Sequence, residues 1–237
     1  MTRVTVFVTT IGAPTFEACR TALENQPCIV DVIANVTPWA AAQNEMLRRC
    51  RTELFIQVDE DMILYPDAVE RLVALIDSQA PNVVMACAPL YDEDLEMPIY
   101  GIKIYRHALI KDIPFEKHIN GDTHDREVWA RHGLTWGRSK RTVENCVGRH
   151  GTFYTPEQAF ARWRGIWQRH RRTNKAPWIK PWLEKLAERY RHSGSSRDLY
   201  AMLGAFIGAT EEPWPDDYGP DASRPDPVLE RLRSLIP

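Results

Sequence analysis

The chain has 237 residues, of which 44% are hydrophobic, so it is long enough to bury a core. Its formal net charge of −2 gives no electrostatic case for a nucleic-acid partner. The five cysteines are scattered and form no C-x-x-C pair, which indicates neither a disulfide framework nor a zinc site and fits a reducing cytoplasm. No segment approaches the roughly 18 consecutive apolar residues of a membrane helix. The apolar run over residues 4–8 is too short for a signal peptide, so we expect a soluble or peripherally attached protein.

The first part of the chain alternates between apolar strand patterns and amphipathic helix patterns. This alternation is typical of an α/β protein with a mostly parallel sheet flanked by helices. Gly12 to Pro14 break the pattern after the first strand, and Thr37-Pro38 begins the second helix. The predicted strands are 4–10, 29–35, 53–58 and 82–88, and the predicted helices are 15–25, 38–50 and 66–76.

After Pro89 the pattern changes. Residues 91–96 form an acidic stretch that we expect to be a solvated loop, and residues 100–106 form a strand that we expect to be antiparallel. A short helix over 107–113, a helix over 126–132 closed by Gly133, and a last strand over 142–147 follow.

From Pro156 onward the sequence is helical in character, with helices predicted over 157–171, 178–191, 198–208 and 228–235. The stretch 211–227 is rich in Pro and Asp and is typical of a loosely held tail. We therefore expect an α/β catalytic domain over 1–155, a helical extension packed on it over 156–210, and a loosely ordered tail with a short terminal helix over 211–237.

The segment Glu53 to Asp61 is the most informative part of the sequence. It is an apolar strand followed by Asp59-Glu60-Asp61. Because side chains alternate along a strand, Asp59 and Asp61 are expected to point the same way and to share one divalent cation, which in turn suits a diphosphate. The alternative is a solvated strand end without a ligand.

Several further residues keep fixed intervals to this acidic pair. Asn44, in Ala41-Ala42-Gln43-Asn44, precedes Asp59 by fifteen residues. With these motifs the chain resembles the family 2-like glycosyltransferases of the GT-A fold, over about residues 3–165. The other matching intervals are those from Phe115-Glu116 to Gly121-Asp122, from Asp122 to Gly133, and from Gly133 to His150.

The resemblance implies roles for individual residues around a nucleotide. Thr9 and Thr10 would hold the base and the ribose, and Asn44 would line the nucleotide site. Asp61 would be a direct metal ligand, with Asp59 nearer the ribose or a water of the metal.

The resemblance also implies a third metal ligand and a catalytic acid. His150 would complete the metal site, and a histidine ligand suits manganese at least as well as magnesium. Asp122 would be the general base for direct displacement with inversion, although retaining enzymes share this metal site. Asp125 lies in the same turn, and either acid could instead cap the helix that begins near Arg126.

The chain also departs from the family pattern. Gln43 stands where Arg is usual, Gly121 stands where an acid often precedes the catalytic Asp, and the segment from Asn35 to Asn44 is short. The acid that this segment normally contributes to the base pocket is missing, so Asn35 or a stacking Trp39 would have to substitute, unless Trp39 is a packing residue.

The predicted partners are a nucleotide-diphosphate sugar, UDP- or GDP-linked, and a glycan or lipid-linked acceptor in surface polysaccharide synthesis. The basic, Trp-rich segment 162–191 either packs its Trp side chains on the sheet and leaves its Arg face solvated, or contacts the inner face of the membrane peripherally. Two alternatives remain: a non-catalytic nucleotide-sugar or glycan-binding protein, and a sugar nucleotidyltransferase. The second is disfavoured because no Gly-rich phosphate loop follows the first strand.

Overall fold

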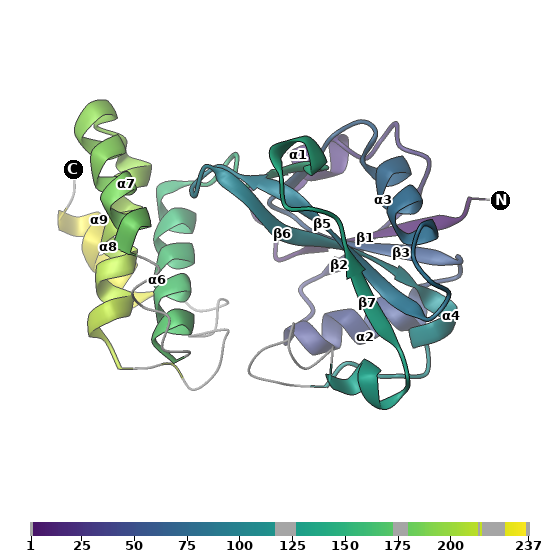
Figure 1. Ribbon diagram of the computed structural model, residues 1–237. Helices are drawn as coiled ribbons and strands as arrows, with labels where there is room; N and C mark the ends of the chain where they lie inside the picture. The colour runs from purple at the N-terminus through teal and green to yellow at the C-terminus, as the bar shows by residue number, and fades with distance from the viewer. Residues whose placement is uncertain (1, 117–126, 173–179, 213, 215–225, 236–237) are drawn as a thin grey trace. The chain divides into compact units, whose positions relative to one another are not determined.

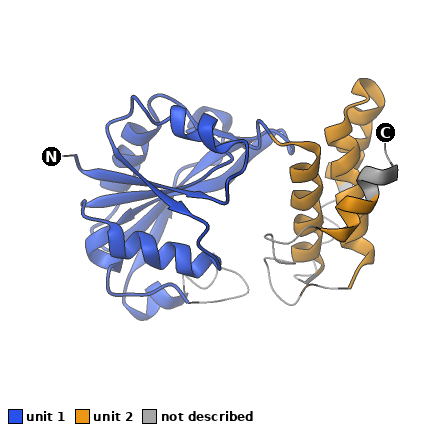
Figure 2. Ribbon diagram, turned by 180° about the vertical axis from the view of Figure 1, so that it is seen from behind, with its two compact units in different colours: residues 1–153 blue, residues 154–237 orange. Residues whose placement is uncertain are grey.

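The structure is a computed structural model that describes residues 2–116, 127–172, 180–212, 214 and 226–235. The chain divides into two compact units, Met1–Phe153 and Tyr154–Pro237 (Figure 2). The first is an α/β unit and the second, where described, is helical (Figure 1).

In the described part of the first unit, eight strands form one mixed sheet in the order β2-β1-β3-β6-β5-β8-β4, with β7 paired to β5 (Figure 1). The α/β class and the mixed sheet confirm the predicted fold class. The predicted antiparallel strand is β6, which pairs antiparallel with both β3 and β5. The strands are β1 Val4–Thr10, β2 Ile29–Ala34, β3 Leu54–Asp59, β4 Met62–Leu64, β5 Val83–Asp92, β6 Met97–Arg106, β7 Thr135–Arg138 and β8 Gly148–His150.

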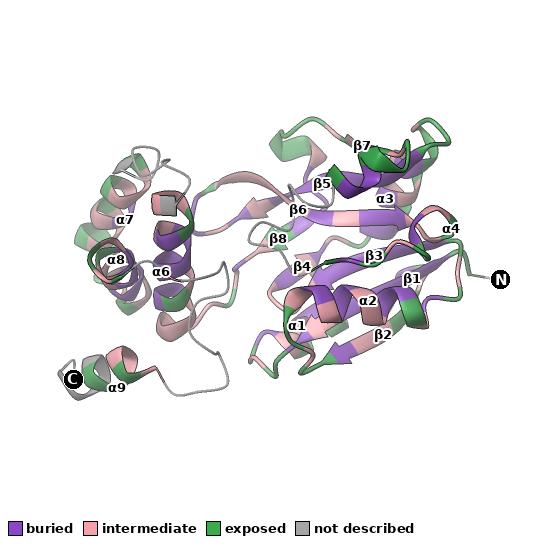
Figure 3. Cartoon of the chain, turned by 90° about the horizontal axis from the view of Figure 1, so that it is seen from below, coloured by how far each residue is buried: buried purple, intermediate pink, exposed green. Residues whose placement is uncertain are grey.

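Strands β1, β2 and β3 are parallel, so their carboxyl ends meet at one edge of the sheet. The register pairs Thr9 with Asp59 and Thr10 with Ala34. Residues 4–8 of β1 are all buried, because this strand lies between β2 and β3 and helices cover both faces of the sheet there (Figure 3). The ends of β1 and β3 therefore deliver the predicted nucleotide and metal residues to the same place.

Three helices provide this cover. Helices α1 (Phe16–Thr21) and α3 (Ala68–Asp77) pack on one face of the sheet, and α2 (Trp39–Arg49) packs on the other (Figure 1). A short helix α4 (His107–Ile110) follows β6, and residues 127–131 are also helical. All five cysteines are free, and four of them are buried, in agreement with a fold that does not depend on disulfides.

Two predicted elements are wrong in detail. The expected strand over 142–147 is a short 3-10 helix, η1 (Val143–Asn145), followed by β8. Here the Arg71 guanidinium donates hydrogen bonds to the carbonyls of Cys146 and Glu144, at 2.8 and 2.9 Å, so these groups are satisfied without a neighbouring strand. Strand β5 continues past Pro89 to Asp92 with a register shift at Ala88/Pro89, where proline has no N–H for the ladder.

The second unit contains α6 (Pro156–Arg172), α7 (Lys180–Ser193), α8 (Ser196–Thr210) and α9 (Pro227–Leu235). Trp163 is fully buried and packs edge to face against Trp182, so these two tryptophans pack together within the second unit. The packing of these residues on the sheet stays a prediction. None of the helices described is long and apolar enough to cross a membrane.

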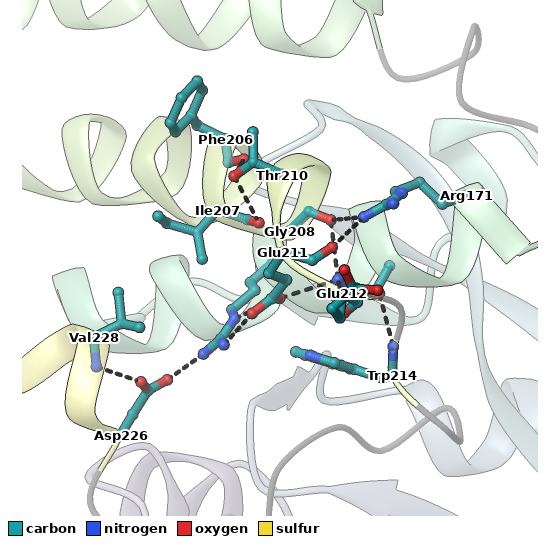
Figure 4. Close-up of polar contacts among 12 residues, drawn as sticks. Arg171, Phe206, Ile207, Gly208, Thr210, Glu211, Glu212, Trp214, Asp226 and Val228 are labelled. Carbon is teal, nitrogen blue, oxygen red and sulfur yellow. Dashed lines mark hydrogen bonds and ion pairs between the residues drawn. The ribbon is translucent and has the colours of Figure 1, made fainter.

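Polar contacts tie the segment after α8 to α6 (Figure 4). The buried guanidinium of Arg164 forms ion pairs with Glu211 and Asp226. The side-chain amide of Gln168 accepts from the backbone N–H of Trp214 at 3.1 Å. Arg171 donates to the carbonyls of Gly208 and Glu211. Where it is described, the acidic end of the chain is therefore anchored by basic side chains of one helix.

Candidate active site

The carboxylate of Asp59 is held at the junction of β1 and β3. The Thr9 hydroxyl donates to Asp59 Oδ1 at 2.6 Å, and the Gln57 amide donates to the same oxygen at 3.2 Å. Burial raises the pKa of Asp59, and the nearby charge of Asp61 raises it further. The predicted neighbours Thr9 and Asp59 are thus brought together, and a cation beside them would relieve the repulsion between the two carboxylates.

Glu60, between the two aspartates, was not predicted as a site residue. Its carboxylate accepts a hydrogen bond from the Thr10 hydroxyl and from the backbone N–H groups of Ile11 and Ala13, at 3.2 and 2.9 Å for the two N–H groups. It therefore fixes the loop after β1, which the resemblance places at the nucleotide. Glu60 lies in the turn after β3, where strand alternation gives no direction for its side chain, so the sequence carried no signal for this contact.

Asp61 and His150 meet across the pair of strands β4 and β8. The ladder pairs Met62 with His150, and the backbone N–H of Gly151 donates to the Asp61 carbonyl at 3.1 Å. In consequence, His150 Nε2 lies 3.3 Å from Asp61 Oδ2. These two residues, 89 positions apart in the sequence, are the predicted metal ligands that the structure brings face to face.

The prediction of a solvated acidic loop over 91–96 is wrong for Asp92 and Asp94, which are buried. Asp92 is the last residue of β5 and is paired in register with His150 of β8. Its Oδ2 lies 2.8 Å from His150 Nδ1. No local signal in the sequence could have shown this, because the contact depends on the pairing of two distant strands.

Asn44 makes two hydrogen bonds with a backbone segment 71 residues away. Its amide nitrogen donates to the Phe115 carbonyl, and its amide oxygen accepts from the Phe115 N–H, both at 2.8 Å. Trp39 packs edge to face on the Phe115 ring, with centroids 5.5 Å apart. Asn44 therefore holds the chain immediately before the segment that carries the predicted base.

Asn35 lies at the end of β2, next to the predicted nucleotide residues. It is exposed, has a positive φ of 56°, and its N–H donates to the Thr10 carbonyl at 2.8 Å. Asparagine tolerates this left-handed conformation better than most residues. Asp122, the predicted base, and its rival Asp125 lie at positions 117–126, outside the described residues.

A profile of the family described as "Glycosyl transferase family 2" matches residues 15–133, which is half of the chain. The chain belongs to glycosyl transferase family 2. This confirms the resemblance, and the match includes Asn44, Asp59 and Asp61, although it ends before His150.

Two solved structures are similar to this family 2 glycosyltransferase, and the first of them supports the same fold. A mannosyltransferase from Pyrobaculum calidifontis, in complex with GDP-Man and Mn²⁺, is 15% identical, with a TM-score of 0.51 over 98% of this chain and 79% of that chain. A glucosyl-3-phosphoglycerate synthase from Mycobacterium tuberculosis, in complex with Mn²⁺, UDP and phosphoglyceric acid, is 13% identical, with a TM-score of 0.46 over 70% of this chain and 76% of that chain. No curated protein matches the sequence.

In this family 2 glycosyltransferase, the carboxylate oxygen of Asp61 and the Nε2 nitrogen of His150 suit a divalent cation as ligands. Two adjacent ligands of an octahedral ion with bonds of about 2.1 Å are about 3.0 Å apart, close to the spacing of these two side chains. Within the described ranges, no group of three or more His, Cys, Asp or Glu side chains is gathered for a metal. The structure thus pairs Asp61 with His150, while Asp59 stays a predicted third member.

Proposed function

We propose that this family 2 glycosyltransferase transfers a sugar from a nucleotide-diphosphate donor to an acceptor hydroxyl, with the help of a divalent cation. The observation that carries the proposal is the facing pair Asp61 and His150, beside the carboxyl ends of β1 and β3. Oxygen and imidazole ligands of this kind suit Mn²⁺ or Mg²⁺. When bound, the cation would neutralise charge on the diphosphate leaving group.

Other residues of the chain would bind the nucleotide. Thr9, Thr10 and Asn35, at the ends of the parallel strands, would hold the base and ribose, in the crevice where open α/β sheets bind ligands. Asp59, fixed by Thr9 and Gln57, would face the ribose or a water of the metal. Thr10 takes part through the loop that Glu60 holds.

Asp122 would act as the general base that removes the proton from the acceptor hydroxyl, in an inverting displacement. The Asn44 amide supports this role, because it fixes the backbone of Phe115 seven residues before Asp122. Asp122→Asn should retain donor binding and lose transfer, whereas Asp125→Asn should retain both. Transfer at the wild-type rate by the Asp122→Asn protein would refute the assignment.

The acceptor we propose is a glycan or a lipid-linked sugar of surface polysaccharide synthesis, reached by a cytoplasmic protein at the inner face of the membrane. Arg169 and Arg191 are exposed on α6 and α7 and support an electrostatic contact with anionic lipid. Arg164 and Trp163 are interior residues and would not take part.

The test is thermal unfolding of the full chain with UDP-, GDP-, CMP- and dTDP-sugars, GDP-mannose included, each with and without Mn²⁺. A ligand at a hundred times its Kd adds about 2.7 kcal/mol to the free energy of unfolding, or roughly 5 to 10 °C in Tm for a protein of this size. We expect a metal-dependent rise with one nucleotide, lost in Asp61→Asn and retained in the exposed control Asp67→Asn. No rise with any donor, or a rise that Asp61→Asn keeps, would contradict the proposal.

A further inference from the structure

We propose that Asp92 is a positioning residue that keeps a proton on His150 Nδ1, so that Nε2 is the ring nitrogen offered to Asp61 and to a metal. The functional value of this proton position rests on the proposed metal site. The proton position itself is a property of the metal-free chain and is tested separately.

Strand pairing places His150 between Asp92 and Asp61. Strand β8 lies between β5 and β4, and His150 is in register with Asp92 on one side and with Met62, the neighbour of Asp61, on the other. The imidazole therefore has a carboxylate oxygen at each nitrogen: Asp92 Oδ2 at 2.8 Å from Nδ1 and Asp61 Oδ2 at 3.3 Å from Nε2.

The approach of the strands depends on a glycine. A Cβ at Gly148, the first residue of β8, would lie 2.6 Å from the Ile63 carbonyl oxygen of β4. Such a contact is too short for any other residue, so the close packing of β8 on β4 requires Gly148 and brings His150 to Asp61.

The two oxygens of Asp92 have distinct partners. Oδ1 accepts the backbone N–H groups of Asp94 and Leu95, at 3.1 and 2.9 Å, which closes the turn after β5. Oδ2 faces the ring of His150. With Asp92 ionised, its carboxylate accepts hydrogen bonds and donates none, so the hydrogen bond at Oδ2 places the proton on His150 Nδ1.

A proton on Nδ1 decides what Nε2 can do. In the neutral ring, Nε2 then carries a lone pair directed at the Asp61 carboxylate, and either a second proton or a metal ion between the two makes this contact favourable. Metal-binding histidines commonly donate their other N–H to a carboxylate in this way, and loss of that partner typically weakens metal binding 10- to 100-fold.

The neighbouring acid Glu93 provides a matched control. It lies one residue further along, but its carboxylate pairs with Arg149 at 3.1 Å and its side chain is 24% exposed, whereas the side chain of Asp92 is fully buried. Glu93→Gln removes one negative charge from the same turn without removing the Asp92 carboxylate.

The variant Asp92→Asn separates the proposed role from a structural one. Asparagine keeps an oxygen for the N–H groups of Asp94 and Leu95, so the turn is retained, but it offers an N–H₂ group to His150 Nδ1. The proton should then move to Nε2, where it competes with a metal for that nitrogen and weakens binding.

The proton position is measured by nitrogen-15 NMR of the full chain with labelled histidine, with His150 assigned through His150→Gln. Mn²⁺ affinity is measured by titration calorimetry. We expect Nδ1 protonated in the wild type and Glu93→Gln, Nδ1 unprotonated in Asp92→Asn, and Mn²⁺ binding 10- to 100-fold weaker in Asp92→Asn alone.

An unprotonated Nδ1 in the wild type would overturn the inference, as would an Asp92→Asn protein that keeps both its Nδ1 proton and its Mn²⁺ affinity. If the wild type has a proton on Nδ1 but binds no Mn²⁺, the proposed metal site is overturned. The role of Asp92 in fixing the proton on Nδ1 is then still supported. The two failures are therefore distinguishable.

Discussion

The contact between α6 and α8 gives a quantitative prediction for Gly204→Ala. A Cβ added at Gly204 would lie 2.1 Å from the Phe160 carbonyl oxygen and 2.8 Å from its carbonyl carbon. Both atoms are backbone atoms of the facing helix, so no side chain can turn away to make room. Gly208, one turn later, meets the Arg164 carbonyl oxygen at 2.6 Å, so the two helices approach closely over a whole turn.

Two effects of opposite sign set the magnitude. Alanine is favoured over glycine inside a helix by about 1 kcal/mol. Overpacking typically costs about 1 to 3 kcal/mol, and this contact is among the severe ones because the helices must separate by roughly 1 Å to reach ordinary contact. We therefore expect Gly204→Ala to lower the free energy of unfolding by about 2 kcal/mol, or roughly 4 to 8 °C in Tm.

The assay is thermal unfolding of the full chain, followed by circular dichroism, with Gly165→Ala as the control. Gly165 lies in α6, the helix that faces Gly204. A Cβ at Gly165 would meet its nearest atom, a ring carbon of Trp214, at 3.6 Å, which is ordinary contact. The control should be neutral or gain up to about 1 kcal/mol. A Gly204→Ala protein as stable as the wild type would refute the close-packing argument.

Other predictions concern the first unit. Gln43 is fully buried and neither polar atom of its side chain has a hydrogen-bond partner in the described part of the chain, so Gln43→Met should raise the free energy of unfolding by about 1 to 3 kcal/mol in a urea titration; a loss of stability would show that the amide is satisfied. Burial, with a smaller contribution from nearby acids, raises the pKa of Cys19 to about 12, so iodoacetamide at pH 8 should modify the partly exposed Cys28 first and Cys19 only on unfolding, as peptide mass spectrometry would show. The Arg3 guanidinium lowers the pKa of Glu53, so the stabilisation from this pair should be present above the unfolded pKa and disappear as the pH falls through the folded pKa. The difference in unfolding free energy between wild type and Glu53→Gln should be below about 1 kcal/mol at pH 7, because the pair is exposed, and should vanish in acid; a difference that persists there would contradict the pairing.

The parallel part of the fold could be predicted because each element carries its own signal. The run Val4 to Val8 is apolar except for Thr5, which indicates a strand covered on both faces, and Asp59 ends another largely apolar strand. The order of the later strands could not be predicted. Strand β8 has only three residues, and its place beside β5 and β4 depends on Gly148 and on partners far away in the sequence.

The same limit applies to the site: residues at the ends of the parallel strands could be predicted, and those placed by the later strands could not. Asp59 ends β3, but Asp61 lies in the turn before β4, so the strand alternation invoked for the pair does not extend to it. Its position is set by the ladder to His150. Asp92 could not be identified from sequence, because a buried acid and a solvated one look alike until the strand beside them is known.

The two hydrogen bonds between Asn44 and Phe115 have an evolutionary consequence. Both bonds are made to backbone atoms, so the side chain at position 115 is not read by Asn44 and is constrained only by its apolar surroundings. Position 44, in contrast, needs a donor and an acceptor at one fixed distance from the backbone. Aspartate has no N–H donor, and the side chain of glutamine is one carbon too long. Among relatives that keep this link, residue 115 should vary among apolar types with an N–H, proline excluded, while residue 44 should remain asparagine.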